Sequence, residues 1–351
     1  MARADYDTAT ERFSSALQRL DACRQRDPSL EANVLQALAF LAPDRLDWHT
    51  WGLIESRLLR LDWSAKTLAF PRYVLAICAS MIQELEGRTL EALRSAAAAE
   101  HAAPTAAFRV LARCRRAAIF RAAGEVLAHR DHTATARAAF DRLDPRRLAG
   151  DEKHIPLALA EEVAHAGDIA CARALMEVHR SREVDAPMMS LTGDVRLGAQ
   201  IRLVEGQIAE LAGERDRAHA AYVDALRAFR KIGFSRRAVI TALRLATLTG
   251  QGYLYDYAVR ATRVLAPSCW MRRALGDRER LYLHESSRAL SNAQREILLL
   301  ICEGKSNAEI AAIRNRSVNT IRNAIAAMFR LFGVDNRTAL AAECYRRGIC
   351  R

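Results

Sequence analysis

The sequence is poor in the residues that interrupt helices. It has 16 glycines and 8 prolines among 351 residues, and aromatic residues make up only 6%. Since glycine and proline disfavour helix interiors most strongly, their scarcity predicts a chain that is nearly all helix. Hydrophobic residues make up 51% and charged residues 27%, a balance that excludes wholesale disorder. The length leaves room for two or three domains.

Lysine is also scarce, because only four of the 53 basic residues are lysines. Arginine therefore provides almost all of the positive charge in a chain whose net charge is +12. Residues 288–351 hold eleven basic and five acidic residues, which is the densest positive charge in the chain. This distribution favours a phosphate-rich partner. A generally basic protein without such a partner is the alternative.

Long apolar runs and paired cysteines are missing. The longest apolar stretches, such as residues 73–82, are about half of a membrane span. We therefore expect no signal peptide, no transmembrane helix and no membrane partner. The eight cysteines lie singly, without a CxxC pair or a spacing typical of zinc ligands. This indicates reduced thiols in a cytoplasmic protein that has no metal site and no cofactor.

A catalytic site is not predicted either. Histidines lie near carboxylates around residues 129–132 and 151–154, but no nucleophile accompanies them at a useful spacing. We therefore expect that the protein is not an enzyme. A hydrolytic enzyme is a weakly supported alternative.

Residues 1–265 repeat a pattern of two amphipathic helices joined by a tight turn. The turns are expected at Gly87, Asp131, Gly167, Gly213 and Gly252, which are 44, 36, 46 and 39 residues apart. Small residues follow each turn, so the paired helices can approach closely. The pattern predicts a solenoid of helical hairpins, and it resembles degenerate tetratricopeptide-like repeats. Such a surface is typical of a concave receptor for a peptide, a protein or a small-molecule effector; a spacer is the alternative.

Residues 290–351 predict four short helices. Ser291 is a candidate N-cap of the first helix, and Gly304 ends it. Ser306 and Glu309 have the spacing of a capping box that begins the second helix, on which Ile310 and Ile313 are expected to face the core. The third helix begins after residue 317, and a fourth covers about residues 338–347.

The third predicted helix has two different faces. One face is apolar and carries Ile321, Ile325, Met328 and Phe332. The opposite face carries Asn319, Arg322, Asn323, Ala326 and Arg330. Exposed arginine and asparagine side chains on a rigid helix can hydrogen-bond to guanine and adenine edges in the major groove. The arrangement predicts a recognition helix.

These motifs resemble the four-helix DNA-binding domain of the LuxR/FixJ family of bacterial transcriptional regulators. The matching residues are Leu290, Glu296, Leu298, Leu300, Gly304, Ser306, Asn307, Glu309, Ile310, Ala311, Ser317, Thr320, Ile321, Gly333, Val334, Asn336, Arg337 and Gly348. The resemblance implies that the side chains of Arg322, Asn323 and Ala326 face DNA bases. It also implies phosphate contacts for the remaining site residues, which are Lys305, Asn319, Thr320 and Arg337.

The sequence departs from the family pattern at two notable positions. Arg314 stands where the family usually has leucine, and Ala324 stands where it often has histidine. Since an unpaired buried charge is costly, Arg314 requires a compensating change. Either Ile313 takes over the core position, or Arg314 pairs with Glu309 or Glu296.

The sequence thus predicts an all-α protein with a helical-repeat sensor or interaction domain at residues 1–265. A linker follows at 266–289, and a LuxR-type helix-turn-helix domain at 290–351. The expected function is sequence-specific regulation of transcription by a homodimer on double-stranded DNA, under the control of an effector bound to the repeats. The alternative is a repeat-protein adaptor whose DNA-binding domain is vestigial.

Overall fold

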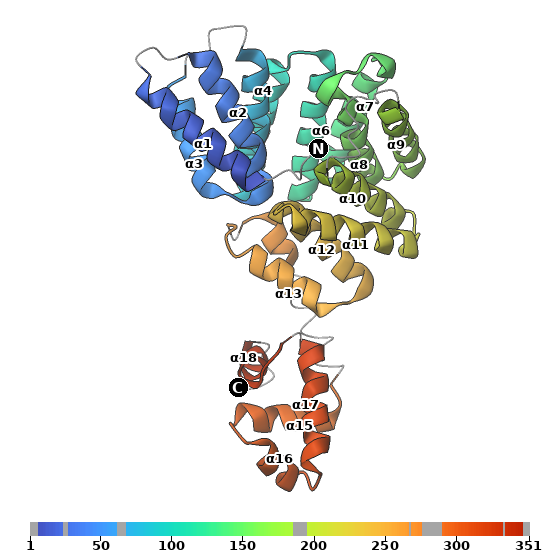
Figure 1. The fold of residues 1–351 in the computed structure, drawn as a ribbon. Helices are drawn as coiled ribbons and strands as arrows, with labels where there is room; N and C mark the ends of the chain where they lie inside the picture. Colours follow the sequence, from blue (N-terminus) through green and yellow to red (C-terminus); the bar gives the residue numbers. More distant parts are fainter. Residues whose placement is uncertain are drawn as a thin grey trace.

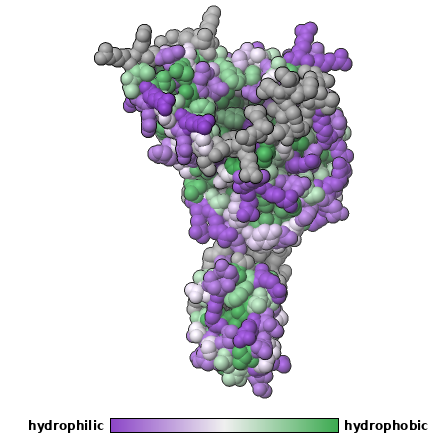
Figure 2. Space-filling model, in the orientation of Figure 1, coloured by the Kyte–Doolittle hydropathy of each residue, from purple (hydrophilic) through white to green (hydrophobic). Residues whose placement is uncertain are grey.

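The computed structural model describes residues 6–23, 27–61, 68–184, 195–266, 268–275, 290–332 and 334–346. Within these ranges the chain forms α-helices and short 3-10 turns, without a strand. The helices are arranged as a large N-terminal unit and a small C-terminal unit (Figures 1 and 2). The all-α fold class is therefore confirmed. No helix among the described residues is both long enough and apolar enough to cross a membrane.

The N-terminal unit begins with three helices, which are α1 (Tyr6–Ala22), α2 (Pro28–Arg45) and α3 (Trp48–Leu58). Helical hairpins follow: α4 (Ala69–Leu85) with α5 (Thr89–Ala102), α6 (Ala106–Ala123) with α7 (Val126–Phe140), α8 (Ile155–Ala166) with α9 (Ile169–Val184), α10 (Val195–Leu211) with α11 (Arg215–Lys231), and α12 (Ser235–Thr249) with α13 (Gly252–Ala261). The 3-10 turns η2 (Pro145–Arg147) and η3 (Gly150–His154) connect α7 to α8. The expected solenoid of helical hairpins is confirmed.

The turns inside the hairpins are made by glycines with positive φ. Gly87, Gly167 and Gly213 have φ of 75°, 104° and 79°, so the turns expected there are confirmed. The turn expected at Asp131 is wrong, because Asp131 lies inside α7 and the turn is at Gly124, with φ of 83°. Two exposed apolar residues follow that turn, Val126 and Leu127, and they imitate a continuing helix face in the sequence. In the last hairpin the turn lies at Gly250, which has a positive φ, and Gly252 begins α13.

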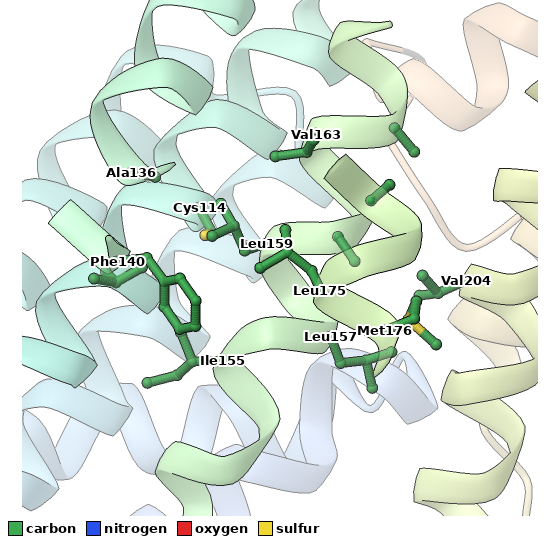
Figure 3. Packing of buried hydrophobic residues seen from close by; sticks show 14 of the residues in the cluster. Cys114, Ala136, Phe140, Ile155, Leu157, Leu159, Val163, Leu175, Met176 and Val204 are labelled. Carbon is green, nitrogen blue, oxygen red and sulfur yellow. The ribbon is translucent and has the colours of Figure 1, made fainter. Parts of the chain in front are cut away.

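Each hairpin buries its apolar face against its neighbours. The largest cluster joins side chains of α6 to α10, and Figure 3 shows its members projecting toward one another. Phe140 of α7, Ile155 and Leu159 of α8, Leu175 of α9 and Val204 of α10 belong to this one cluster. Because the core is continuous across hairpins, no hairpin completes its core alone, as expected for a repeat array.

The two ends of the array meet. Helix α12 packs against α2, and Arg236 of α12 donates through Nε to Asp44 of α2 at 2.8 Å. Leu46, Val239 and Tyr255 share one hydrophobic cluster around this contact. The solenoid is therefore closed on itself, and its inner helices surround a hollow.

The segment after α13 returns to α4. Ser268 donates through Oγ to the carbonyl oxygen of Glu86 at 3.1 Å, and Trp270 donates through Nε1 to Glu84 Oε1 at 2.7 Å. Gly87 permits this approach, because a Cβ atom there would clash with the side chain of Ser268. Packing on the first unit thus continues beyond residue 265 to Leu275, which lies in the same cluster as Tyr255. The rest of the predicted linker, residues 276–289, lies outside the described residues, and the domain boundaries stay predictions.

The described part of the C-terminal unit has four helices, as expected: α15 (Asn292–Cys302), α16 (Asn307–Ile313), α17 (Val318–Phe332) and α18 (Arg337–Arg346). Its own hydrophobic core contains side chains from all four, including Leu298, Ile310, Ile325 and Leu340. This core is separate from the clusters of the repeat unit. The two units therefore have independent cores.

The close approach of α10 and α11 generates a stability prediction. A Cβ atom on Gly206 would lie 2.6 Å from the ring of Tyr222, which is fully buried. Gly206→Ala should therefore lower the free energy of unfolding by about 1–3 kcal/mol, because the packed ring must shift. Thermal and urea unfolding, followed by circular dichroism, measure this change.

Gly198→Ala is the matched control, because Gly198 lies in the same helix and a Cβ atom added there would have no neighbour within 4 Å. That variant should keep or raise the stability, by up to about 1 kcal/mol, since alanine favours helix more than glycine does. Equal effects of the two substitutions would contradict the packing argument.

Candidate nucleic-acid interface and central cavity

Local hydrogen bonds fix the ends of α15, α16 and α17. Ser291 and Ser306 each form a capping box, with Gln294 and Glu309 respectively. Ser317 Oγ accepts the backbone N–H of Thr320 at 3.1 Å and thereby caps α17. The predicted N-caps are confirmed. Because each cap satisfies backbone donors that would otherwise lack partners, short helices can begin at these residues.

Helices α16 and α17 are joined by a tight turn. Gly304 ends α15 with φ of 81°, and Asn315, in the turn before α17, has φ of 50°. Asparagine tolerates this left-handed conformation better than most residues. Two helices joined by a short turn in a bundle of this kind form a helix-turn-helix.

Helix α17 has the two faces that its sequence predicts. Ile321, Ile325, Met328 and Phe332 are buried in the domain core. The opposite face is exposed and carries five of the predicted site residues, which are Asn319, Thr320, Arg322, Asn323 and Ala326. Arg322 donates through Nη1 to Asn319 Oδ1 at 3.2 Å, so two neighbouring polar groups on this face are oriented together. The exposed face therefore offers the guanidinium of Arg322 and the amides of Asn319 and Asn323 on a rigid helix.

The other two predicted site residues, Lys305 and Arg337, lie outside α17 and are half-buried. Arg337 donates to Asn307 Oδ1 at 2.8 Å and to the backbone carbonyl of Lys305. It thus holds the loop before α16 against α18. Contacts of all seven predicted residues with DNA stay a prediction.

Arg314 is compensated by an ion pair. Its Nη1 contacts Glu296 Oε2, which connects α16 to α15. The other alternative is wrong, because Ile313 is 56% exposed and does not replace a core leucine. Ala324, the second departure, packs at the margin of the domain core. Neither departure therefore opens the core of this unit.

The sequence interpretation missed a second candidate site, the hollow inside the repeat unit. It is a cavity of about 540 Å³, within the usual size range of ligand sites. Side chains of α2, α4, α6, α8, α10 and α12 line it, together with Trp270. The lining residues are widely separated in the sequence, so no local motif marks the cavity.

Ion pairs cross the lining of the cavity. Carboxylates in or behind the wall pair with arginines: Glu84 with Arg115 at 2.5 Å, Glu162 with Arg121 at 2.8 Å, Glu210 with Arg244 at 2.9 Å, and Asp44 with Arg236 at 2.5 Å. Two groups share a partner. Glu161 lies 3.2 Å from Arg121, and Arg237 lies 3.6 Å from Asp44.

The surroundings shift the protonation of these groups. Burial disfavours ionisation of Glu162, but the charge of Arg121 and a hydrogen bond from His129 outweigh it and lower the pKa to about 2. Burial likewise opposes ionisation of Asp44, yet Arg236 and Arg237 lower its pKa. Burial and the nearby charges of Arg121 and Arg244 lower the pKa of His165 to about 2. Glu162 and Asp44 are therefore ionised, and His165 is neutral, at physiological pH.

The helix-turn-helix geometry defines the C-terminal unit as a domain of the class that presents a helix to the DNA major groove. Residues 288–343 match the family described as bacterial regulatory proteins, luxR family. This unit is therefore a luxR-type DNA-binding domain, and the family resemblance is confirmed.

The whole chain also aligns with a solved structure. This is the crystal structure of a Rap protein complexed with competence and sporulation factor. The alignment covers 98% of this chain and 92% of the Rap chain, with 14% sequence identity and a TM-score of 0.45. The search of curated proteins gave no match.

The lowered pKa of His165 generates a prediction for acid stability. His165 Nε2 accepts a hydrogen bond from Arg244 at 3.0 Å, so the folded protein keeps this imidazole neutral until about pH 2. In the unfolded chain the imidazole binds a proton below its ordinary pKa of about 6.5. Above pH 6.5 His165 therefore does not make the free energy of unfolding depend on pH. Below pH 6.5 the unfolded chain binds a proton that the folded chain does not, and the free energy of unfolding falls by about 1.4 kcal/mol per pH unit.

His165→Gln keeps a hydrogen-bond acceptor for Arg244 and removes the titrating group. Urea unfolding at pH 7, 6 and 5 should show a shallower loss of stability for this variant than for the wild type. His219→Gln, at an exposed position of α11, is the control for loss of a histidine. Parallel pH profiles for wild type and His165→Gln would show that the argument is wrong.

Proposed function

We propose that this protein is a sequence-specific regulator of transcription that binds double-stranded DNA through α17. The observation that carries the proposal is the exposed polar face of α17, opposite a face that is sealed in the core of a luxR-type domain. Arg322 and Asn323 read base edges, and Ala326 contacts a thymine methyl group. Phosphates are contacted by the remaining site residues, which are Lys305, Asn319, Thr320 and Arg337.

The DNA-bound form is a homodimer, and it acts in the cytoplasm of a bacterium. One helix-turn-helix domain buries little surface on DNA, so two copies on half-sites about one helical turn apart supply the affinity. Cross-linking or analytical ultracentrifugation with DNA measures this stoichiometry.

The repeat unit receives an effector in its central cavity. This is supported by the position of Trp270, which lines the cavity and belongs to the last described segment before the C-terminal unit. The same segment is bonded to α4 through Ser268 and Trp270. An occupant of the cavity therefore contacts the chain that leads to the DNA-binding domain, and it acts by favouring one placement of that segment.

Arg322→Ala tests the assignment of the recognition helix. Full-length protein selects DNA sites from a random-sequence library, and gel-shift titration then compares the variant with the wild type on the selected site. Loss of a bidentate contact to a base should cost about 1–3 kcal/mol on this site and relax the preference at one position.

Arg147→Ala is the control for the loss of one positive charge, because this side chain lies in the repeat unit and is 88% exposed. It should leave the affinity for the selected site unchanged. An unaltered affinity and sequence preference in Arg322→Ala would remove α17 from the interface.

Salt dependence separates the regulator from an adaptor with a vestigial domain. An interface that neutralises several phosphates should lose affinity steeply, by orders of magnitude, between about 50 and 200 mM salt. An adaptor would bind DNA at neither concentration. The same gel-shift titration, repeated across this range, makes the distinction.

A further inference from the structure

One arginine in the central cavity is less well satisfied than the others. Five arginines and four glutamates line or approach the hollow, and Asp44 is the fifth carboxylate behind the wall. The total charge is balanced, but the hydrogen bonds are not evenly shared. Arg115, Arg121, Arg236 and Arg244 all donate to side chains at hydrogen-bond distance.

Arg237 is the exception. Within the described ranges its side chain donates no hydrogen bond, and its Nε lies 3.6 Å from an Asp44 oxygen that already accepts from Arg236. The side chain is 20% exposed and lines the cavity. A guanidinium has five N–H donors, so Arg237 can still take hydrogen-bond partners from the cavity. An anion in the cavity would supply those partners.

The rest of the lining indicates what such an anion is attached to. Half-buried apolar side chains face the cavity from three sides, among them Ile77 of α4, Leu111 of α6 and Ile240 of α12. Trp270 adds an aromatic surface. A ligand that fills the hollow must therefore cover apolar surface as well as satisfy Arg237, and so it must be amphipathic.

The neighbouring charges favour a single negative charge. Arg237 shares its counter-charge, Asp44, with Arg236, and Glu161, whose partner Arg121 is shared with Glu162, lines the same cavity. A phosphate dianion would bring two negative charges next to Glu161, and it would be repelled more strongly than a group with one charge. A carboxylate carries one charge, and its two oxygens match the guanidinium fork.

We infer that the central cavity is a binding site for a carboxylate joined to an apolar body, with the carboxylate paired to Arg237 and the body packed against Ile77, Leu111, Ile240 and Trp270. A free small acid and the C-terminus of an apolar peptide both supply this chemistry. The inference rests on the proposed effector role of the repeat unit and names the class of its ligand.

Calorimetric titration of the full-length chain tests the site with defined probes. The probes are octanoate, the neutral isostere octanamide, the peptide acetyl-Ala-Leu-Ala-Leu with a free carboxyl terminus, and the same peptide as its C-terminal amide. At least one carboxylate should bind. The affinity for its neutral counterpart should be lower by at least about tenfold, as expected for a charged hydrogen-bonded pair. Binding of octanoate identifies a small acid, and binding of the peptide alone identifies a peptide terminus.

Arg237→Met removes the guanidinium and keeps an apolar side chain of similar length. It should weaken binding of the carboxylate about tenfold and remove the difference between the carboxylate and its neutral isostere. Arg227→Met, on the exposed face of α11 with a side chain that is 75% exposed, is the matched control and should bind as the wild type does. Circular dichroism establishes that each variant is folded.

The variant Trp270→Phe tests whether the ligand binds next to Trp270 in the cavity. Carboxylate binding should change the tryptophan fluorescence of the wild type, and the change should be lost in Trp270→Phe. Equal affinity for acid and amide, unaltered binding in Arg237→Met, or no binding of any probe at millimolar concentration would overturn the inference. These titrations contain no DNA, so their failure leaves the assignment of α17 untouched, and failure of the Arg322→Ala test leaves the ligand site untouched.

Discussion

The contact between α12 and α2 is the interaction on which the shape of the repeat unit depends. Arg236 and Asp44 are 192 positions apart in the chain, yet they form a buried hydrogen-bonded ion pair. Buried charges require hydrogen bonds to repay their desolvation, and here the Nε of Arg236 supplies one to Asp44 at 2.8 Å. By joining the last hairpin to the beginning of the array, it brings the inner helices around one hollow.

The cavity combines features that are unusual together in a protein interior. Its wall is largely apolar, but ion pairs cross it, and the pKa of Glu162 is lowered to about 2 although the group is buried. Removing one partner of such a pair leaves an uncompensated charge, which is far more costly than the pair itself is favourable. A cavity with this wall therefore selects its occupant by charge as well as by shape, and Arg237 is the position where the selection is made.

The C-terminal unit follows a different logic, because local interactions determine most of it. Capping boxes at Ser291 and Ser306 begin two helices, and Gly304 ends one. An apolar stripe from Ile321 to Phe332 seals α17 against the other helices, which leaves its polar face outside. Each of these features spans a few residues of sequence. For this reason the sequence alone predicted the four helices, their caps and the exposed face of α17.

The sequence by itself determined the helical class, the hairpin repeat and the DNA-binding unit, because helix periodicity, capping and glycine turns act between near neighbours. It was misleading at two places. A turn was expected at Asp131 because the exposed Val126 and Leu127 resemble a continuing core face, and the exposed Ile313 resembles a core residue. Only the tertiary structure decided the closure of the array, the cavity and the position of Arg237 in its lining. These depend on which helices distant in sequence pack together, and a pairing such as Arg236 with Asp44 has no signature in either local segment.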